Sequence, residues 1–176
     1  MSENINRLIK FSNFLADEAR KISMNYFKKK IKISSKLNKE FDPITIADIS
    51  IQKKINKIIE DNYPFHSILG EEESRLKISD YEWCIDPIDG TKSFIQGVPL
   101  WGTLISIAKK GNIILGIADI PALDERYIGY SGRSYKIIRG KKTLLKVKKS
   151  SDISNSILNT TSPYLFANKS DQLSFE

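Results

Sequence analysis

The hydrophobic pattern of this chain changes its period near residue 80, and this change limits the folds that the chain can adopt. Before that point, two segments carry apolar residues at helical spacing, which predicts two helices. The first would end near FKKK at residues 27–30, and the second would run from about Asp48 to Asn62, since Pro64 prevents its continuation. The expected inward positions are Ile5, Leu8, Leu15, Ala19, Ile22 and Tyr26 in the first helix and Ile51, Ile55, Ile58 and Ile59 in the second.

After residue 80 the pattern consists of short runs typical of β-strands, separated by turn signals such as KKGN, PALDE, SGR and RGKK. The runs are residues 81–85, 103–110, 113–120, 126–130, 135–139 and 143–147. Short turns between consecutive strands predict an antiparallel meander. The expected fold class is therefore α+β, with two N-terminal helices packed on an antiparallel sheet. Residues 156–166 predict one further strand that enters a loop.

The composition excludes several classes of protein. Of the 176 residues, 40% are hydrophobic and 28% are charged, as in an ordinary soluble domain. The N-terminal stretch has acidic residues and no long apolar run, so we expect neither a signal peptide nor a transmembrane helix, and a cytoplasmic location. Cys84 is the only cysteine, which excludes a disulfide framework and a multi-cysteine zinc site. His66 is the only histidine, which leaves little basis for Ser-His-Asp chemistry.

The formal net charge of +7 raises the alternative of nucleic-acid binding. Its support is the lysine clusters at residues 28–30, 109–110, 141–142 and 148–149. These clusters are dispersed over expected helix ends and hairpin tips, and no aromatic residues interleave with them. We therefore expect a solvated basic surface that attracts anionic metabolites, with neither nucleic acid nor a membrane as a partner.

An acidic loop follows the first predicted strand, in the sequence IDPIDGTKSF at residues 85–94. A turn containing a proline can point Asp86 and Asp89 into one small volume, where two like charges repel unless a cation compensates them. Oxygen ligands at this spacing suit Mg²⁺, and the carbonyl of Ile88 lies between them as a further ligand. Gly90 permits close backbone approach, and Thr91 opens a short segment whose N–H groups can hold a phosphate. The alternative is an ordinary capped turn.

Two other acidic stretches strengthen the hypothesis of a metal site. Glu71 directly follows a glycine that ends an apolar run, and Asp48 lies at the start of the second predicted helix beside Thr45. Taken singly, these residues fit a surface loop and an N-cap. Together with the aspartates they fit a site for phosphomonoester hydrolysis, in which Asp48 and Thr91 orient and deprotonate a water molecule.

The stretches DPITIAD, GEE and DPIDGTKSF, in this order and spacing, resemble those of the inositol-monophosphatase superfamily of Mg²⁺-dependent sugar phosphatases. The continuation from FIQGVPLWGTLISI and the later TTSPYLF look most like the histidinol-phosphate phosphatase branch. The resemblance covers nearly the whole chain and implies the N-terminal half of an αβαβα fold. The metal ligands that it implies are Glu71, Asp86, the carbonyl of Ile88 and Asp89. The implied catalytic residues are Asp48, Thr91 and Glu71, and the implied contacts to the substrate phosphate are Asp89, Gly90, Thr91 and Lys92.

One departure concerns a second, C-terminal α/β domain, in which the superfamily carries a Trp-Asp motif with a further metal ligand. Here Trp83 and Trp101 are followed by Cys84 and Gly102. We therefore expect an N-terminal domain over residues 1–150 and, over residues 151–176, the start of a second domain that is truncated. A homodimer is one assembly that the resemblance implies.

Three functional hypotheses remain open at the level of the sequence. The first is hydrolysis of histidinol phosphate to histidinol and phosphate, in histidine biosynthesis. The second is the same chemistry on another small phosphomonoester, such as inositol monophosphate. The third is a protein that binds metal and phosphate without turnover, because the Trp-Asp motif is missing from the sequence.

Overall fold

The computed structural model describes residues 3–30, 33–35, 43–147 and 152–157, and it divides the chain into two compact units, 1–145 and 146–176. In the second unit it describes one short 3₁₀ helix, Ile153–Asn155. The strand expected over residues 156–166 lies outside the described residues from 158 onward. The first unit contains the longer helices and the strands.

Both predicted helices are confirmed, as α1 (Ile5–Tyr26) and α2 (Ile46–Asn62). Helix α2 begins two residues earlier than the apolar pattern indicated, because Thr45 caps it and the side chain of Asp48 closes a capping box. A two-stranded ladder of β1 (Ile33–Ser35) and β2 (Pro43–Thr45) precedes it, and no periodic pattern had predicted these strands. Within the described residues, no helix is both long and apolar enough to cross a membrane.

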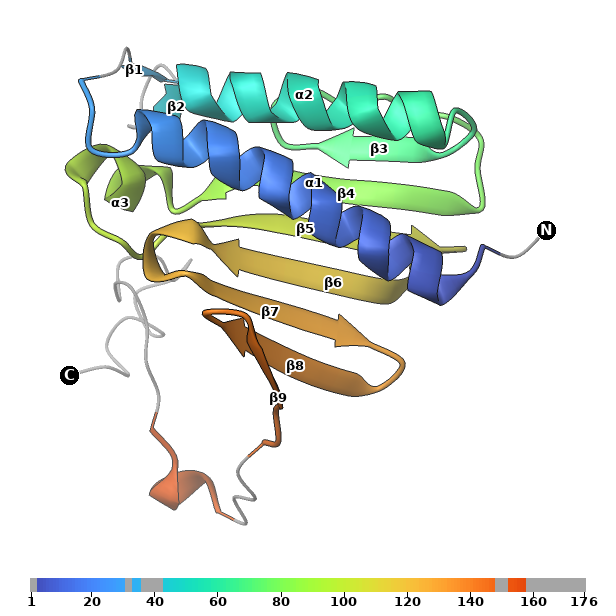
Figure 1. The fold of residues 1–176 in the computed structure, drawn as a ribbon. Coiled ribbons are helices and arrows are strands. Elements are labelled where there is room, and N and C mark those ends of the chain that lie inside the picture. Colours follow the sequence, from blue (N-terminus) through green and yellow to red (C-terminus); the bar gives the residue numbers. More distant parts are fainter. Residues whose placement is uncertain (1–2, 31–32, 36–42, 148–151, 158–176) are drawn as a thin grey trace, which may run out of the picture. The chain divides into compact units, whose positions relative to one another are not determined.

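Among the described residues, the main sheet has seven strands in the order β3-β4-β5-β6-β7-β8-β9 (Figure 1). Their bounds are β3 (Ser67–Gly70), β4 (Tyr81–Asp89), β5 (Gly102–Lys109), β6 (Asn112–Ile120), β7 (Glu125–Tyr130), β8 (Arg133–Ile138) and β9 (Lys141–Leu144). A third helix, α3 (Thr91–Gln96), lies between β4 and β5, and a 3₁₀ turn, η1 (Pro121–Leu123), lies between β6 and β7.

The α+β class is confirmed, but the sheet is mixed. From β4 to β9 neighbouring strands are antiparallel, as the short turns predicted. Strand β3 instead pairs in parallel with β4. The connection over residues 71–80 carries the chain back to the end where β3 began, so that both strands run the same way.

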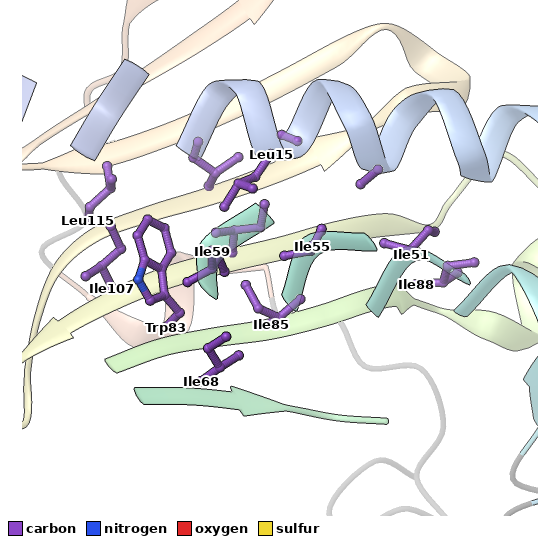
Figure 2. Close-up of a cluster of buried hydrophobic side chains, with 14 of the residues drawn as sticks. Leu15, Ile51, Ile55, Ile59, Ile68, Trp83, Ile85, Ile88, Ile107 and Leu115 are labelled. Atoms are coloured by element: carbon purple, nitrogen blue, oxygen red, sulfur yellow. The ribbon is translucent and has the colours of Figure 1, made fainter. Parts of the chain in front are cut away.

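The hydrophobic core lies between α1, α2 and one face of the sheet (Figures 1 and 2). Isoleucines of α2 lie above Trp83 and Ile85 of β4 there, and Leu15 of α1, Ile107 of β5 and Leu115 of β6 belong to the same core (Figure 2). Alternate residues of each strand point to this face, which is why the strands read as alternating patterns in the sequence.

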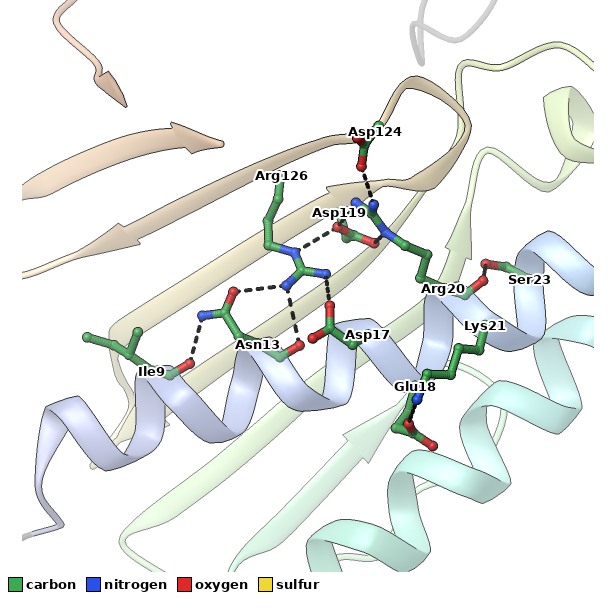
Figure 3. A network of polar contacts seen from close by, with 10 residues as sticks. All are labelled: Ile9, Asn13, Asp17, Glu18, Arg20, Lys21, Ser23, Asp119, Asp124 and Arg126. Carbon is green, nitrogen blue, oxygen red and sulfur yellow. Dashed lines mark hydrogen bonds and ion pairs between the residues drawn. The ribbon is translucent and has the colours of Figure 1, made fainter. Parts of the chain in front are cut away.

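A polar network joins α1 to β6 and β7 at one edge of this core (Figure 3). Asp119 of β6 is 0% exposed and accepts hydrogen bonds from Arg20 at 2.8 and 3.0 Å and from Arg126 at 2.8 Å. Arg126 also donates to Asn13 and Asp17 of α1. Because a buried carboxylate is costly unless it is paired, the network fixes how α1 crosses the sheet.

The other face of the sheet carries a groove of about 880 Å³. The strand residues that alternate with the core positions line it, and they are largely apolar or small: Cys84, Leu104, Ser106, Gly116, Ala118, Tyr127 and Gly129. Glu71 and Asp86 also line this groove. Two of the predicted metal ligands therefore lie on the face of the sheet that α1 and α2 do not cover.

Candidate functional site

A β-bulge at the end of β4 determines where the two aspartates of the acidic loop point. In a regular strand, residues three apart face opposite sides, so Asp86 and Asp89 would be separated by the sheet. In the structure, Asp86 lies opposite Leu104 and Asp89 opposite Gly102, with two residues of β4 facing only Thr103. Since Leu104 and Gly102 are two apart on β5, both aspartates lie on one face.

The bulge also explains the burial of the residue between them. Ile88 is two residues after Asp86 and would share its face in a regular strand. Instead it is 1% exposed and belongs to the core. The inserted residue therefore directs an apolar side chain inward and returns the next carboxylate to the groove face.

The carboxyl group of Asp86 lies in surroundings that disfavour its ionised form. One of its oxygens, Oδ1, is buried and has no hydrogen-bond partner among the described residues. Burial raises the pKa of Asp86 to about 8, with further contributions from a hydrogen bond to Glu71 and from the negative charges of Glu71 and Asp89. A carboxyl group with these neighbours holds a proton at neutral pH unless a cation replaces it.

Glu71 reaches Asp86 because of how β3 ends. The backbone N–H of Glu71 donates to the carbonyl of Ile85 at 3.0 Å and so extends the pairing with β4 by one residue. Asn56 of α2 donates to the carbonyl of Glu73 at 2.9 Å, which holds the connection after β3 from the helix side. Gly70 leaves no room for a side chain, since an added Cβ would lie 2.4 Å from that same carbonyl.

The turn after β4 places Gly90, Thr91 and Lys92 at the start of α3. Gly90 has a φ of 84°, which an L-residue with a side chain adopts only with strain. The hydroxyl of Thr91 donates to the carbonyl of Ile88 at 3.0 Å. A carbonyl oxygen has two lone pairs, so this contact leaves one for a further ligand. Lys92 is exposed.

Asp48 lies in the first turn of α2 and is 2% exposed. Its Oδ2 accepts from the backbone N–H of Thr45 at 2.9 Å and from the hydroxyl of Thr45 at 2.5 Å. Strand β2, which ends at Thr45, contacts α3, so the start of α2 lies near the element that begins with Thr91. The joint action of Asp48 and Thr91 on a water molecule stays a prediction.

Two features of the residues around Asp86 fit a site for a divalent cation. A buried carboxylate oxygen without a partner and a second carboxylate within hydrogen-bonding reach are the electrostatic situation that a cation resolves. In the part of the chain that the structure describes, no three His, Cys, Asp or Glu side chains are gathered closely enough to form a complete ligand set. Glu71 and Asp86 are thus the pair that the structure brings together, with Asp89 on the same face.

The surroundings of His66 and Cys84, the single histidine and the single cysteine of the sequence, bear on whether they can take part in nucleophilic chemistry. The indole N–H of Trp83 donates to Nδ1 of His66 at 3.0 Å, and the imidazole stacks on the rings of Tyr63 and Tyr81. Burial lowers the pKa of His66 and raises that of Cys84. A neutral, stacked histidine and a protonated thiol fit packing residues better than a nucleophile and its base.

Sequence reasoning missed Thr103, whose hydroxyl donates to the carbonyl of Pro87 at 2.8 Å across the bulge. The predicted strand ended at residue 85, whereas β4 continues to Asp89, so Pro87 lies inside a central strand, where a proline marks a bulge. The residue that donates to the carbonyl of Pro87 could not be predicted from the sequence, since it depends on the register between β4 and β5.

The comparisons with known proteins agree with the fold and the motifs. The model of the inositol monophosphatase family matches residues 4–172. Among solved structures, an inositol monophosphatase from Zymomonas mobilis aligns with a TM-score of 0.79 and 29% identity, over 99% of this chain and 65% of that one.

Curated relatives include a chloroplastic bifunctional phosphatase, IMPL2, of Arabidopsis thaliana, which is 40% identical over 96% of this chain and 48% of its own length. A histidinol-phosphatase of Chlorobaculum parvum is 37% identical over 64% of this chain and 44% of its own length. The chain thus spans about half the length of the curated relatives that it matches.

Proposed function

Because the chain belongs to the inositol monophosphatase family, we propose that its acidic groove edge serves Mg²⁺-dependent hydrolysis of a small phosphomonoester. The observation that carries this proposal is the bulge of β4, which puts Asp86 and Asp89 on one face beside Glu71. A hydrogen-bonded pair of carboxyl groups with a third on the same face has little structural use without a cation.

The proposed ligands of Mg²⁺ are the carboxylates of Glu71, Asp86 and Asp89 and the carbonyl of Ile88. Bound there, Mg²⁺ would supply Lewis acidity toward the phosphoryl oxygens and favour ionised water at neutral pH. These oxygen donors suit a cation that prefers few carboxylates and retains several waters.

The remaining roles belong to the chain's own side chains. Asp48, fixed by its capping box, would accept a proton from the attacking water through Thr91, and Glu71 would assist. Asp89, Gly90, Thr91 and Lys92 would contact the phosphate, and the exposed ammonium of Lys92 would offset its charge. The inward-facing Ile88 supports this arrangement, because its burial anchors the loop that carries these residues.

Histidinol phosphate is the proposed substrate, converted with water to histidinol and phosphate. The support is the sequence Trp101-Gly102-Thr103 and the 37% identity to a protein named as a histidinol-phosphatase. Inositol monophosphate or another small phosphomonoester is the second candidate, because the family model and a solved relative bear the name inositol monophosphatase.

The test is release of inorganic phosphate from histidinol phosphate and from inositol 1-phosphate, with Mg²⁺ and with EDTA, beside an Asp86→Asn variant. We expect Mg²⁺-dependent release from histidinol phosphate that the variant abolishes. Release that persists in EDTA or in Asp86→Asn would contradict the metal role. Binding of Mg²⁺ and phosphate without release would favour the third hypothesis, a protein without turnover.

A further inference from the structure

The bulge of β4 shifts the register of the strand ladder at two residues. Pro87 and Ile88 together face the single residue Thr103 of β5. A bulge of this kind interrupts the hydrogen bonds of the ladder, and a buried carbonyl left unpaired is costly. The hydroxyl of Thr103 donates to the carbonyl of Pro87 at 2.8 Å, and Thr103 is 0% exposed. A side chain of β5 therefore contacts the backbone of the bulge directly, at the carbonyl of Pro87.

Thr103 itself is held on a rigid part of the sheet. Its neighbour across the next ladder is Asp119, which Arg20 and Arg126 bind from α1 and β7. Gly102 packs against the same strand so closely that an added Cβ would lie 2.7 Å from the carbonyl of Asp119. The donor is thus fixed to the sheet independently of the loop that it holds.

We infer that Thr103 is a positioning residue, whose buried hydroxyl fixes the bulge at Pro87 and thereby keeps Asp86 and Asp89 on one face. This inference rests on the proposed function for its consequence in metal binding, but the hydrogen bond and the bulge stand without it. Residues that orient metal ligands from behind commonly change metal affinity when they are replaced.

A merely structural role is the competing explanation, since a buried threonine also fills space. The two explanations differ in what the hydroxyl does. If Thr103 only fills space, valine replaces it at nearly the same volume. If it fixes the bulge, valine removes the hydroxyl that donates to the carbonyl of Pro87, whereas serine restores this donor.

The experiment compares the wild-type chain with Thr103→Val and Thr103→Ser, and with Thr143→Val as a control on the exposed strand β9. The first readout needs no metal: hydrogen exchange at the backbone amides of residues 88–91, measured in EDTA. The second readout is the affinity for Mg²⁺, measured by calorimetry. Chemical unfolding of each variant separates local from global effects.

We expect faster exchange at residues 88–91 in Thr103→Val, confined to that segment, and Mg²⁺ affinity lower by about 10–100-fold. Thr103→Ser should restore both readouts, and Thr143→Val should change neither. Wild-type exchange at residues 88–91 in Thr103→Val would overturn the inference, as would a uniform increase along the whole chain that serine does not reverse.

Two further outcomes are distinguishable. If Thr103→Val does not fold, Thr103→Ala removes the donor without placing a methyl group against the carbonyl, and the same local increase in exchange is expected. If the wild-type chain binds no Mg²⁺, the proposed function fails in this chain. The exchange readout then still decides whether Thr103 holds the bulge.

Discussion

The surroundings of Asp86 are unusual for a carboxyl group that has only a structural role. Its pKa of about 8 in the folded chain exceeds the value of about 3.9 for an unfolded chain. Between these values, the folded state retains a proton that the unfolded state has released. The free energy of unfolding therefore falls as the pH rises from about 4 to about 8, when no metal is bound.

The first prediction is that Asp86→Asn stabilises the metal-free chain. At pH 7 we expect a gain on the order of 1–2 kcal/mol, allowing for solvent screening of a half-buried group, and little gain near pH 4. Urea unfolding in EDTA at pH 4 to 8 measures this difference. Asp61→Asn, at an exposed position, is the control. An asparagine variant that is less stable than the wild type at pH 7 would refute this explanation of Asp86.

Gly70 gives a second prediction at this scale. An added Cβ would lie 2.4 Å from the carbonyl of Glu73 and 2.5 Å from Nε2 of Gln52, so Gly70→Ala must displace the loop that carries Glu71. We expect a loss of about 1–3 kcal/mol in the free energy of unfolding. Gly116→Ala is the matched control, because an added Cβ there meets nothing within 4 Å. Equal stability of the two variants would show that the loop adapts freely.

Several residues of the candidate site stand out in the sequence and others do not. Glu71 and Asp89 stand out because acidic residues next to glycines after apolar runs are unusual and chemically specific, and Asp86 stands out because it lies three residues before Asp89. Thr103 does not stand out, because its role arises from a cross-strand register that shifts by one residue at the bulge. A local pattern contains no information on such a shift.

At the scale of elements, the polar network around Asp119 holds α1 on the sheet (Figure 3). Asp119→Ala would leave two arginines without their shared partner, one of them only 10% exposed in its side chain. We expect a loss of about 3–5 kcal/mol in the free energy of unfolding. Lys57→Ala breaks the exposed pair with Asp61 and should cost no more than about 0.5 kcal/mol. A similar loss in both variants would contradict the importance of the network.

His66 links the loop before β3 to Trp83 of β4. Its Nδ1 accepts a hydrogen bond, so a second proton would break that contact, and burial lowers its pKa. As the pH falls below about 6.5, His66 therefore takes up a proton in the unfolded state before it does so in the folded state. The free energy of unfolding thus decreases with falling pH.

This pH dependence is the fourth prediction, and it runs opposite to the effect of Asp86. It is best measured in the Asp86→Asn background, by chemical unfolding between pH 7 and pH 5. We expect the free energy of unfolding to decrease toward pH 5, and His66→Gln to flatten the curve. An unchanged slope in His66→Gln would assign the effect to other groups.

The predictability of the elements followed their length and regularity. The long helices and the strands from β4 onward have strong periodic patterns, and the structure confirms them. The residues of β3 were described only as an apolar run before Glu71, because four residues are too few to show the alternation of a strand. Its parallel pairing depends on where the connection over residues 71–80 returns, which is a tertiary property.

At the scale of the whole first unit, the two faces of the sheet differ: one packs in the core and the other carries the candidate site. The face toward α1 and α2 is a continuous apolar core, whereas the opposite face carries the groove whose edge includes Glu71 and Asp86 (Figure 2 shows the core side). A ligand would reach the carboxylates from the groove face without disturbing the core. The bulge of β4 is the element that makes this division compatible with two aspartates three residues apart.

The central claim is that this bulged strand end and Glu71 together bind Mg²⁺. Calorimetric titration of the chain with Mg²⁺, beside Asp86→Asn, tests it most directly. We expect a saturable binding signal in the wild type, with release of a proton because the carboxyl group of Asp86 is protonated beforehand, and loss of both in the variant. Equal binding in the two proteins, or binding by the wild type without proton release, would contradict it.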